Sequence, residues 1–144
     1  GKIVRTNHAC TKTMGTWCQH PWTSSAVVDG QCFFVDVSAA RAFPAQFAAA
    51  DTKCVGLGGR LATIESKAHN DAVVAAIKNA PAVAKKTGKY PLPGKKPFIG
   101  LSDLATDGTY RWQDGTKLDW TNFKTNGEKS GKNAVRIDST DGKW

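Results

Sequence analysis

The stretch 122–137, NFKTNGEKSGKNAVRI, combines residue types that could bind a cation or a sugar. Its only acid is Glu128, which is accompanied by three asparagines and three lysines. Calcium takes six to eight oxygen ligands, including charged carboxylates. Counted generously, Glu128, Asn126 and Asn133 could supply such oxygens, which is too few for a tight site from this chain alone. The alternative is a solvated surface loop, which the pair Asn126-Gly127 and the run EKSGKN suit.

A second group of candidate residues is basic. The net charge is +8, and part of this excess lies in one segment, at Lys78, Lys85, Lys86, Lys89, Lys95 and Lys96. Such a patch could attract sulfated glycans, acidic lipid headgroups or nucleic acid, or it could be a solvated face that only keeps the protein soluble. We expect an anionic glycan rather than nucleic acid, held by Lys85, Lys86, Lys95 and Lys96 through charge-assisted contacts that need no bridging cation.

Four cysteines, Cys10, Cys18, Cys32 and Cys54, all fall in the first 54 residues. An even number in a small aromatic-rich domain indicates disulfides and an oxidising compartment. Four cysteines allow three full pairings, and the sequence alone does not choose among them. A rival interpretation is a zinc clip from His8, Cys10, Cys18 and His20, although this spacing matches no common zinc pattern.

No pattern of catalytic residues is visible. His8, His20 and His69 have no serine or cysteine partner at a recognisable spacing, and there is no phosphate-binding loop. Enzyme activity is therefore not expected. Asp107 and Asp114 belong to TDG and QDG, which are turn sequences. Two tryptophans in strand-like stretches, Trp112 and Trp120, are expected in the core rather than as sugar-stacking platforms.

The chain contains no apolar run that approaches the roughly 20 residues needed to span a bilayer. The N-terminal segment GKIVRTNHAC also lacks an apolar signal region, so any signal peptide has been removed or never existed. A length of 144 residues with 40% hydrophobic residues suits one domain with its own core.

The first elements that could position these residues are a hairpin and a helix. Residues 22–28 and 32–37 are β-prone and flank Asp29-Gly30, a strong hairpin signal. A helix is expected over 38–54, with an apolar face that includes Phe43, Phe47, Ala50 and Cys54. The glycines of GLGG at 56–59 should end it. RLATI then predicts a short strand or an extended link.

A second helix is expected over 67–80, capped by Ser66 and ended by Pro81. Its inward face should consist of Val73, Ala76, Ile77 and Ala80. Residues 81–97 hold prolines, glycines and lysines, and they predict a basic loop rather than a core element. Short strands are expected at 98–101, 109–113 and 134–138, followed by a turn at STDG. Helices followed by strands indicate an α+β fold.

Several stretches resemble a known family. They are CQHPW…GQCFF, QFAAADTKCVGLGGRLATIES, HNDAV, FIGLSDLATDGTYRWQDGTKLDWTNF and AVRIDSTDGKW. In their order and spacing they resemble the long form of the C-type lectin-like domain over residues 18–144, with 1–17 as an N-terminal extension. The resemblance implies a compact α+β fold with two helices, two small antiparallel sheets and a long irregular loop. In members that bind calcium and sugar, that loop carries both.

The resemblance also implies roles for the cysteines. Cys18 and Cys32 match the extra N-terminal hairpin bridge. The family usually pairs the cysteine at the place of Cys54 with one in a terminal strand, which would follow Trp144. Ala134 stands where a further cysteine is usual. We expect a nicked or incomplete chain, with another chain or fragment completing the fold. The second explanation is that the first nine residues fill the vacant edge, leaving Cys10 to pair with Cys54 or with another chain.

Mapped onto the family's calcium site, the acid-proline-amide triplet reads Glu128-Lys129-Ser130 here. Serine is a weaker calcium ligand than an amide carbonyl, and Lys132 stands where a second acid is usual. An ammonium group there opposes a cation, while Asn133 keeps a polar side chain. The stretch therefore resembles a relic or a variant of a sugar site, and calcium would be a cofactor only with ligands from elsewhere.

Together these observations predict a secreted, non-catalytic recognition module that binds carbohydrate. An anionic glycan bound without calcium is physically the better ligand. The alternative, from a different class, is a protein-interaction, adhesion or structural matrix module that binds no sugar.

Overall fold

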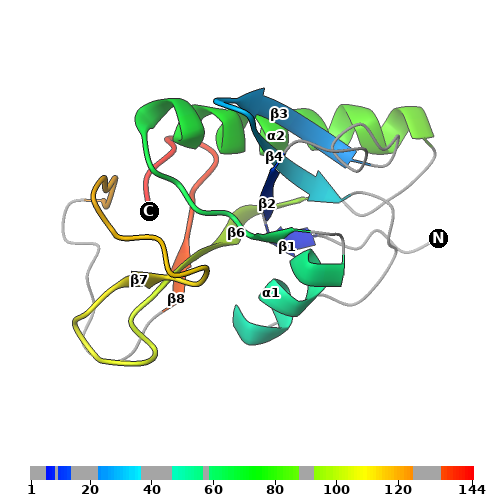
Figure 1. The fold of residues 1–144 in the computed structure, drawn as a ribbon. Coiled ribbons are helices and arrows are strands. Elements are labelled where there is room, and N and C mark those ends of the chain that lie inside the picture. The colour runs from blue at the N-terminus through cyan, green and yellow to red at the C-terminus, as the bar shows by residue number, and fades with distance from the viewer. Residues whose placement is uncertain are drawn as a thin grey trace.

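The computed structural model describes residues 6–8, 10–13, 23–36, 47–56, 59–87, 93–124 and 134–144 (Figure 1). The elements follow in the order β1 (Thr6–His8), β2 (Cys10–Thr13), β3 (Thr23–Val28), β4 (Gln31–Asp36), α1 (Phe47–Gly56), β5 (Arg60–Leu61), α2 (Lys67–Thr87), β6 (Pro93–Ser102), β7 (Arg111–Trp112) and β8 (Ala134–Arg136).

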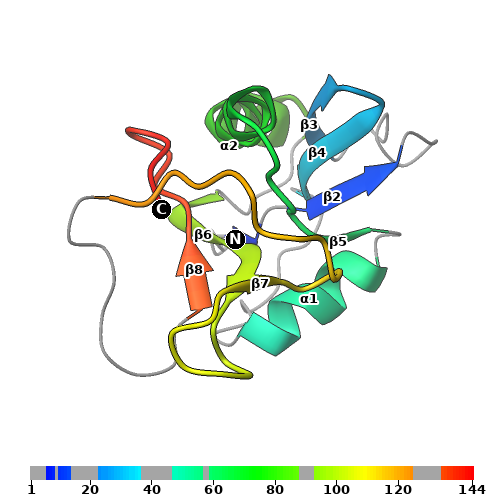
Figure 2. The same cartoon turned by 60° about the vertical axis from the view of Figure 1, so that its left-hand side comes forward.

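The strands form two small sheets. One has the order β3-β4-β2-β5 and is antiparallel throughout. In the other, β6 pairs with β7 and β8 in antiparallel fashion and with β1 in parallel. Helix α2 lies beside β3 and β4, and α1 lies on the opposite side of the molecule (Figures 1 and 2). The predicted α+β class, with two helices and two small sheets, is confirmed.

The local predictions hold where turn and cap chemistry is strong. Asp29 and Gly30 both have positive φ, 52° and 73°, which suits the tight turn between β3 and β4. Ser66 caps α2, because its hydroxyl oxygen accepts a hydrogen bond from the backbone N–H of His69 at 3.2 Å. The predicted inward face of α2 is buried, namely Val73, Ala76, Ile77 and Ala80. On α1, Phe47, Ala50 and Cys54 are buried, while Phe43 lies outside the described residues.

The predicted basic loop at 81–97 is wrong. Helix α2 continues past Pro81 to Thr87, and β6 already begins at Pro93. Proline removes only one helical hydrogen bond, although at a cost, and the alanines and lysines that follow favour the helix. Strand β6 in turn is held by partners on both sides. Pro97 is fully buried, and its carbonyl accepts a hydrogen bond from the backbone N–H of Ile137 at 3.0 Å.

One disulfide joins Cys10 in β2 to Cys54 in α1, with 5.6 Å between the two Cα atoms. Both cysteines are fully buried in a cluster with Phe34, Phe47, Leu61 and Phe98. The structure thus shows the pairing given above as the second explanation, and Cys10 is available neither to another chain nor to zinc. Cys32 is also disulfide-bonded, and its predicted partner Cys18 lies outside the described residues.

Strands β1 and β2 come from the segment predicted as an N-terminal extension, yet each pairs within one of the two sheets. The domain boundary and the completing fragment stay predictions. In the part of the chain that the structure describes, no helix has the length and apolar character needed to cross a bilayer.

Candidate functional site

The predicted cation and sugar ligands Asn126, Glu128, Ser130, Lys132 and Asn133 fall in the stretch 125–133, outside the described residues. The structure does show what precedes that stretch. The backbone N–H of Lys124 donates to the carbonyl of Trp144 at 2.8 Å, and the N–H of Trp144 donates to the carbonyl of Asn122 at 3.0 Å. Residues 122–124 are therefore tied to residue 144 before the stretch begins, and β8 follows it.

The four lysines predicted to hold an anionic glycan are divided between two elements. Lys85 and Lys86 belong to α2, and Lys95 and Lys96 belong to β6. Their side chains lie outside what the structure describes, so their contacts with a glycan stay a prediction.

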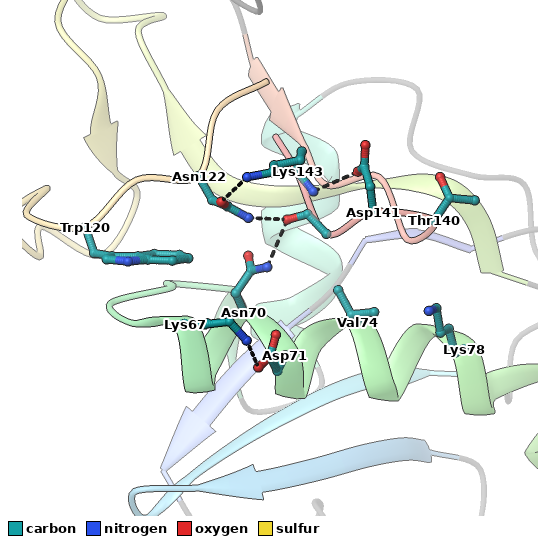
Figure 3. A pocket seen from close by; sticks show the side chains of 11 residues that line it. Lys67, Asn70, Asp71, Val74, Lys78, Trp120, Asn122, Thr140, Asp141 and Lys143 are labelled. Carbon is teal, nitrogen blue, oxygen red and sulfur yellow. Dashed lines mark hydrogen bonds and ion pairs between the residues drawn. The ribbon is translucent and has the colours of Figure 1, made fainter. Parts of the chain in front are cut away.

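A pocket of about 320 Å³ lies between α2, the turn around residues 138–143 and Trp120 (Figure 3). One side is formed by residues of α2, namely Lys67, Asn70, Asp71, Val74 and Lys78. The other side is formed by residues from the C-terminal third of the chain, namely Trp120, Asn122, Thr140, Asp141, Gly142 and Lys143. Two segments that are distant in sequence thus build one concave surface, as ligand sites commonly do.

The floor of this pocket is a closed hydrogen-bond network around the carbonyl of Gly142. That carbonyl accepts from the side-chain amides of Asn70 at 2.9 Å and Asn122 at 2.7 Å. The side-chain oxygen of Asn70 accepts a hydrogen bond from the indole N–H of Trp144 at 2.8 Å. Gly142 has φ +73°, and a Cβ there would lie only 3.1 Å from the Asn70 amide nitrogen. The network fixes the floor without help from a ligand.

Trp120 forms a wall of the pocket and is held by other rings. It meets Trp144 edge-on, with 5.6 Å between the ring centroids and 80° between the planes. Trp144 also meets Trp112 and Phe123 edge-on. Trp112 and Trp144 are buried, whereas Trp120 is only half-buried. A fixed aromatic ring therefore remains partly accessible at the pocket, beside polar side chains.

Both acids of the pocket have cationic partners. Lys67 pairs with Asp71 one helical turn away at 2.8 Å. The ammonium of Lys124 contacts Asp138 at 2.8 Å and Asp141 at 3.5 Å. The hydrogen bond from Lys124, aided by those from Thr140, holds the pKa of Asp138 well below its usual range. The ammonium group of Lys124 thus holds the turn over the pocket.

These contacts bear on calcium. Asp138 and Asp141 follow the stretch 125–133 in the sequence, and the ammonium of Lys124 already contacts both. An ammonium group in contact with these two carboxylates repels a divalent cation. The stretch 125–133 adds only one acid, Glu128. Among the described residues, no three His, Cys, Asp or Glu side chains gather as metal ligands. Asp138 and Asp141, as the structure describes them, therefore do not form a calcium site, and calcium binding through Glu128, Asn126 and Asn133 stays a prediction.

The family follows from comparison with known proteins. Residues 44–144 match the model of the lectin C-type domain. The chain belongs to this family. Ladderlectin of Oncorhynchus mykiss is 33% identical over 95 residues, which make up 66% of this chain and 43% of ladderlectin. Lectin BRA-3 of Megabalanus rosa is 27% identical over 120 residues, which make up 81% of this chain and 63% of that lectin.

Among solved structures, the cow C-type carbohydrate-recognition domain of CD23, determined in the presence of GlcNAc2Man3 oligosaccharide, is 26% identical with a TM-score of 0.45. The match covers 65% of this chain and 63% of the CD23 chain. The C-type lectin domain described here therefore spans less than two thirds of each of these relatives.

Within this C-type lectin domain, Asp114 is a turn residue as predicted. Its carboxylate accepts from the backbone N–H of Thr116 at 2.9 Å and from the hydroxyl of Thr63 at 2.7 Å. Trp112 is a core residue, also as predicted. For Trp120 the prediction is wrong in part, because its half-buried ring lines the pocket. The proposed zinc clip is wrong, since Cys10 is disulfide-bonded.

Sequence reasoning missed Asn70, although a signal for it exists. Asn70 lies three and seven residues before Val73 and Ile77, so helical spacing places it on the apolar face of α2. Buried polar side chains need hydrogen-bond partners, and Asn70 is only 3% exposed. A polar residue on an apolar helix face would have indicated a structural network, but not which carbonyl it serves.

Proposed function

We propose that this C-type lectin domain is a non-catalytic, extracellular recognition module that binds carbohydrate in the pocket between α2 and Trp120, without calcium. The observation that carries the proposal is the fixed, half-buried ring of Trp120 among amide, hydroxyl and ammonium side chains. The relatives support it, because both curated proteins are named lectins. The disulfide between Cys10 and Cys54 supports an oxidising, extracellular location.

The chemistry of the pocket suits a sugar. A pyranose ring presents an apolar C–H face and a rim of hydroxyl groups. The ring of Trp120 offers an apolar surface for that face. Around it, Asp71, Thr140 and Lys143 offer hydrogen-bond acceptors and donors for the rim. Because the floor is already hydrogen-bonded, binding costs little ordering of the protein, which favours affinity.

The ammonium of Lys124, which contacts Asp138 and Asp141, supports calcium-independence. In this proposal a sugar contacts the protein directly, so removing divalent cations leaves binding unchanged. The same experiment distinguishes this proposal from the alternative of a module that binds no sugar. Such a module would give no glycan signal, either with divalent cations or without them.

The test is binding to a panel of immobilised glycans, in calcium and in excess chelator, with Trp120→Leu and Trp120→Phe as variants. We expect equal binding in both buffers, a loss of about tenfold or more for the leucine variant, and partial retention for phenylalanine, which keeps a ring. Thermal melts of each variant show that the fold is intact. Unchanged binding by a folded Trp120→Leu variant, or binding that disappears with chelator, would overturn the proposal.

A further inference from the structure

The pocket carries positive charge that no acid of the described residues balances. Of its three lysines, Lys67 is paired with Asp71. Lys143 donates from its ammonium to the Asn122 side-chain oxygen at 3.1 Å, which is a neutral acceptor. Lys78 lines the pocket, is exposed, and makes no ion pair with any residue in the described ranges. Among the residues that the structure describes, the ammonium groups of Lys78 and Lys143 therefore have no carboxylate partner at this surface.

The acids of the pocket do not fully offset this charge. Asp71 is held by Lys67, and Asp141 lies 3.5 Å from the Lys124 ammonium. Lys124 is shared between Asp138 and Asp141, so it does not fully balance Asp141. The residues that line the pocket still include three lysines against two acids, which leaves an excess of one positive charge. A neutral sugar would use the pocket but leave Lys78 and Lys143 unpaired, whereas an acidic sugar would pair with them.

The pocket is also long in the direction of α2. Asp71 and Lys78 are seven residues apart, which is two helical turns or about 10 Å along the axis. Trp120 lies near the α2 end that carries Lys67, and Lys78 lies toward the other end (Figure 3). Lys85 follows at the same seven-residue spacing, so its position falls on the same face of α2. A span of about 10 Å along the helix is longer than one sugar ring.

We infer that the ligand is an acidic oligosaccharide that lies along α2. One ring stacks on Trp120, and carboxylate or sulfate groups of the same chain pair with Lys143, which lies beside Asn122, and separately with Lys78, which lies farther along α2. This inference rests on the proposed function and adds the charge and the direction of the ligand. Uronic-acid carboxylates and sulfate esters are both anionic oxygen acceptors for ammonium groups, so the experiment has one arm for each.

The test measures Kd for three soluble tetrasaccharide probes: a heparin fragment with sulfates, a hyaluronan fragment with carboxylates alone, and neutral chitotetraose. The variants are Lys78→Gln, Lys143→Gln and the double change. Lys117→Gln is the control, because Lys117 is exposed and lies outside this pocket. This substitution removes the same charge as the pocket variants do. Replacing an exposed ammonium typically changes such contacts by up to about fivefold.

We expect an acidic probe to bind more tightly than chitotetraose, and each pocket variant to weaken that probe by about three- to fivefold. The double variant should bind acidic and neutral probes alike, while Lys117→Gln should match the wild type. Raising the salt concentration should weaken only the acidic probes. Whichever acidic probe shows this pattern identifies sulfate or carboxylate as the group recognised.

The inference fails if Lys78→Gln and Lys143→Gln act no differently from Lys117→Gln, or if chitotetraose binds as well as both acidic probes. That result leaves the proposed function intact, provided that Trp120→Leu still weakens binding by about tenfold or more. If Trp120→Leu has no effect on any probe, the proposed site itself is wrong. Acidic binding that persists after the pocket changes but depends on residues 85–96 would move the ligand to the basic segment.

Discussion

Two regions of this domain are stabilised by different kinds of interaction. Around the disulfide between Cys10 and Cys54, apolar side chains pack against a covalent bond, with Phe47 and Phe98 meeting edge-on at 6.1 Å. Around Trp144, the pocket floor depends on two asparagine amides and a chain of edge-to-face rings. The first region is a cluster of buried aromatic, aliphatic and cysteine side chains. The second presents hydrogen-bonding groups at a surface, which is what recognition requires.

The region that is expected to contribute most to stability, around the disulfide, is therefore separate from the pocket that would bind a ligand. The disulfide ties β2 to α1, and neither of its cysteines lines the pocket. The pocket floor instead joins α2 to the C-terminal turn. Changes in the two regions should therefore act on different observables, with the disulfide acting on global stability and the floor acting on both stability and binding.

The largest expected effect comes from removing the disulfide. The double variant Cys10→Ala/Cys54→Ala opens a loop with a sequence separation of 44. The chain-entropy model then predicts a loss of about 4 kcal/mol in the free energy of unfolding. Urea denaturation measures it. Glycan affinity at low temperature, where the variant is folded, should be close to that of the wild type, and a specific loss of affinity in folded protein would contradict the separation of the two regions.

An intermediate effect is expected from Asn70→Leu. The change leaves the buried indole N–H of Trp144 without an acceptor, which should cost about 2 kcal/mol. Because Trp144 supports Trp120, glycan affinity should fall as well. Asn122→Ala is the matched control: the Gly142 carbonyl keeps its bond from Asn70, so the loss should be smaller. Equal losses for the two variants, measured by urea denaturation, would show that Trp144 does not depend on Asn70.

The smallest expected effect is on the turn over the pocket, through the ion pair of Lys124. The pKa of Asp138 is lowered in the folded state, so its stabilising contribution is complete above the ordinary carboxyl pKa and is lost as pH falls through the lower, folded value. The Lys124→Met variant should therefore be less stable than the wild type near pH 7. The difference in stability between the two proteins should narrow under strongly acidic conditions. Thermal melts from pH 7 to pH 2 measure this, and a pH-independent difference would argue against the ion pair.

Sequence reasoning was most successful where a structure depends on local chemistry. The Asp29-Gly30 turn, the Ser66 cap and the buried face of α2 each follow from residues close in the chain. It failed at Pro81, where local propensity suggested a stop but the helix continues. It also placed the ligand chemistry in the stretch 125–133, which the structure does not describe, and in lysines whose side chains it does not describe either.

The sequence by itself determined the family resemblance, the α+β class and the local elements, because short-range periodicity, turns and caps are encoded by neighbouring residues. Only the tertiary structure decided that Cys10 pairs with Cys54, and that Asn70 and Gly142, 72 residues apart, share a hydrogen bond at the base of a pocket. Those contacts depend on how α2 and the C-terminal turn pack against each other. No local pattern carries that information, since contacts between distant segments arise only when the whole chain buries its apolar faces together.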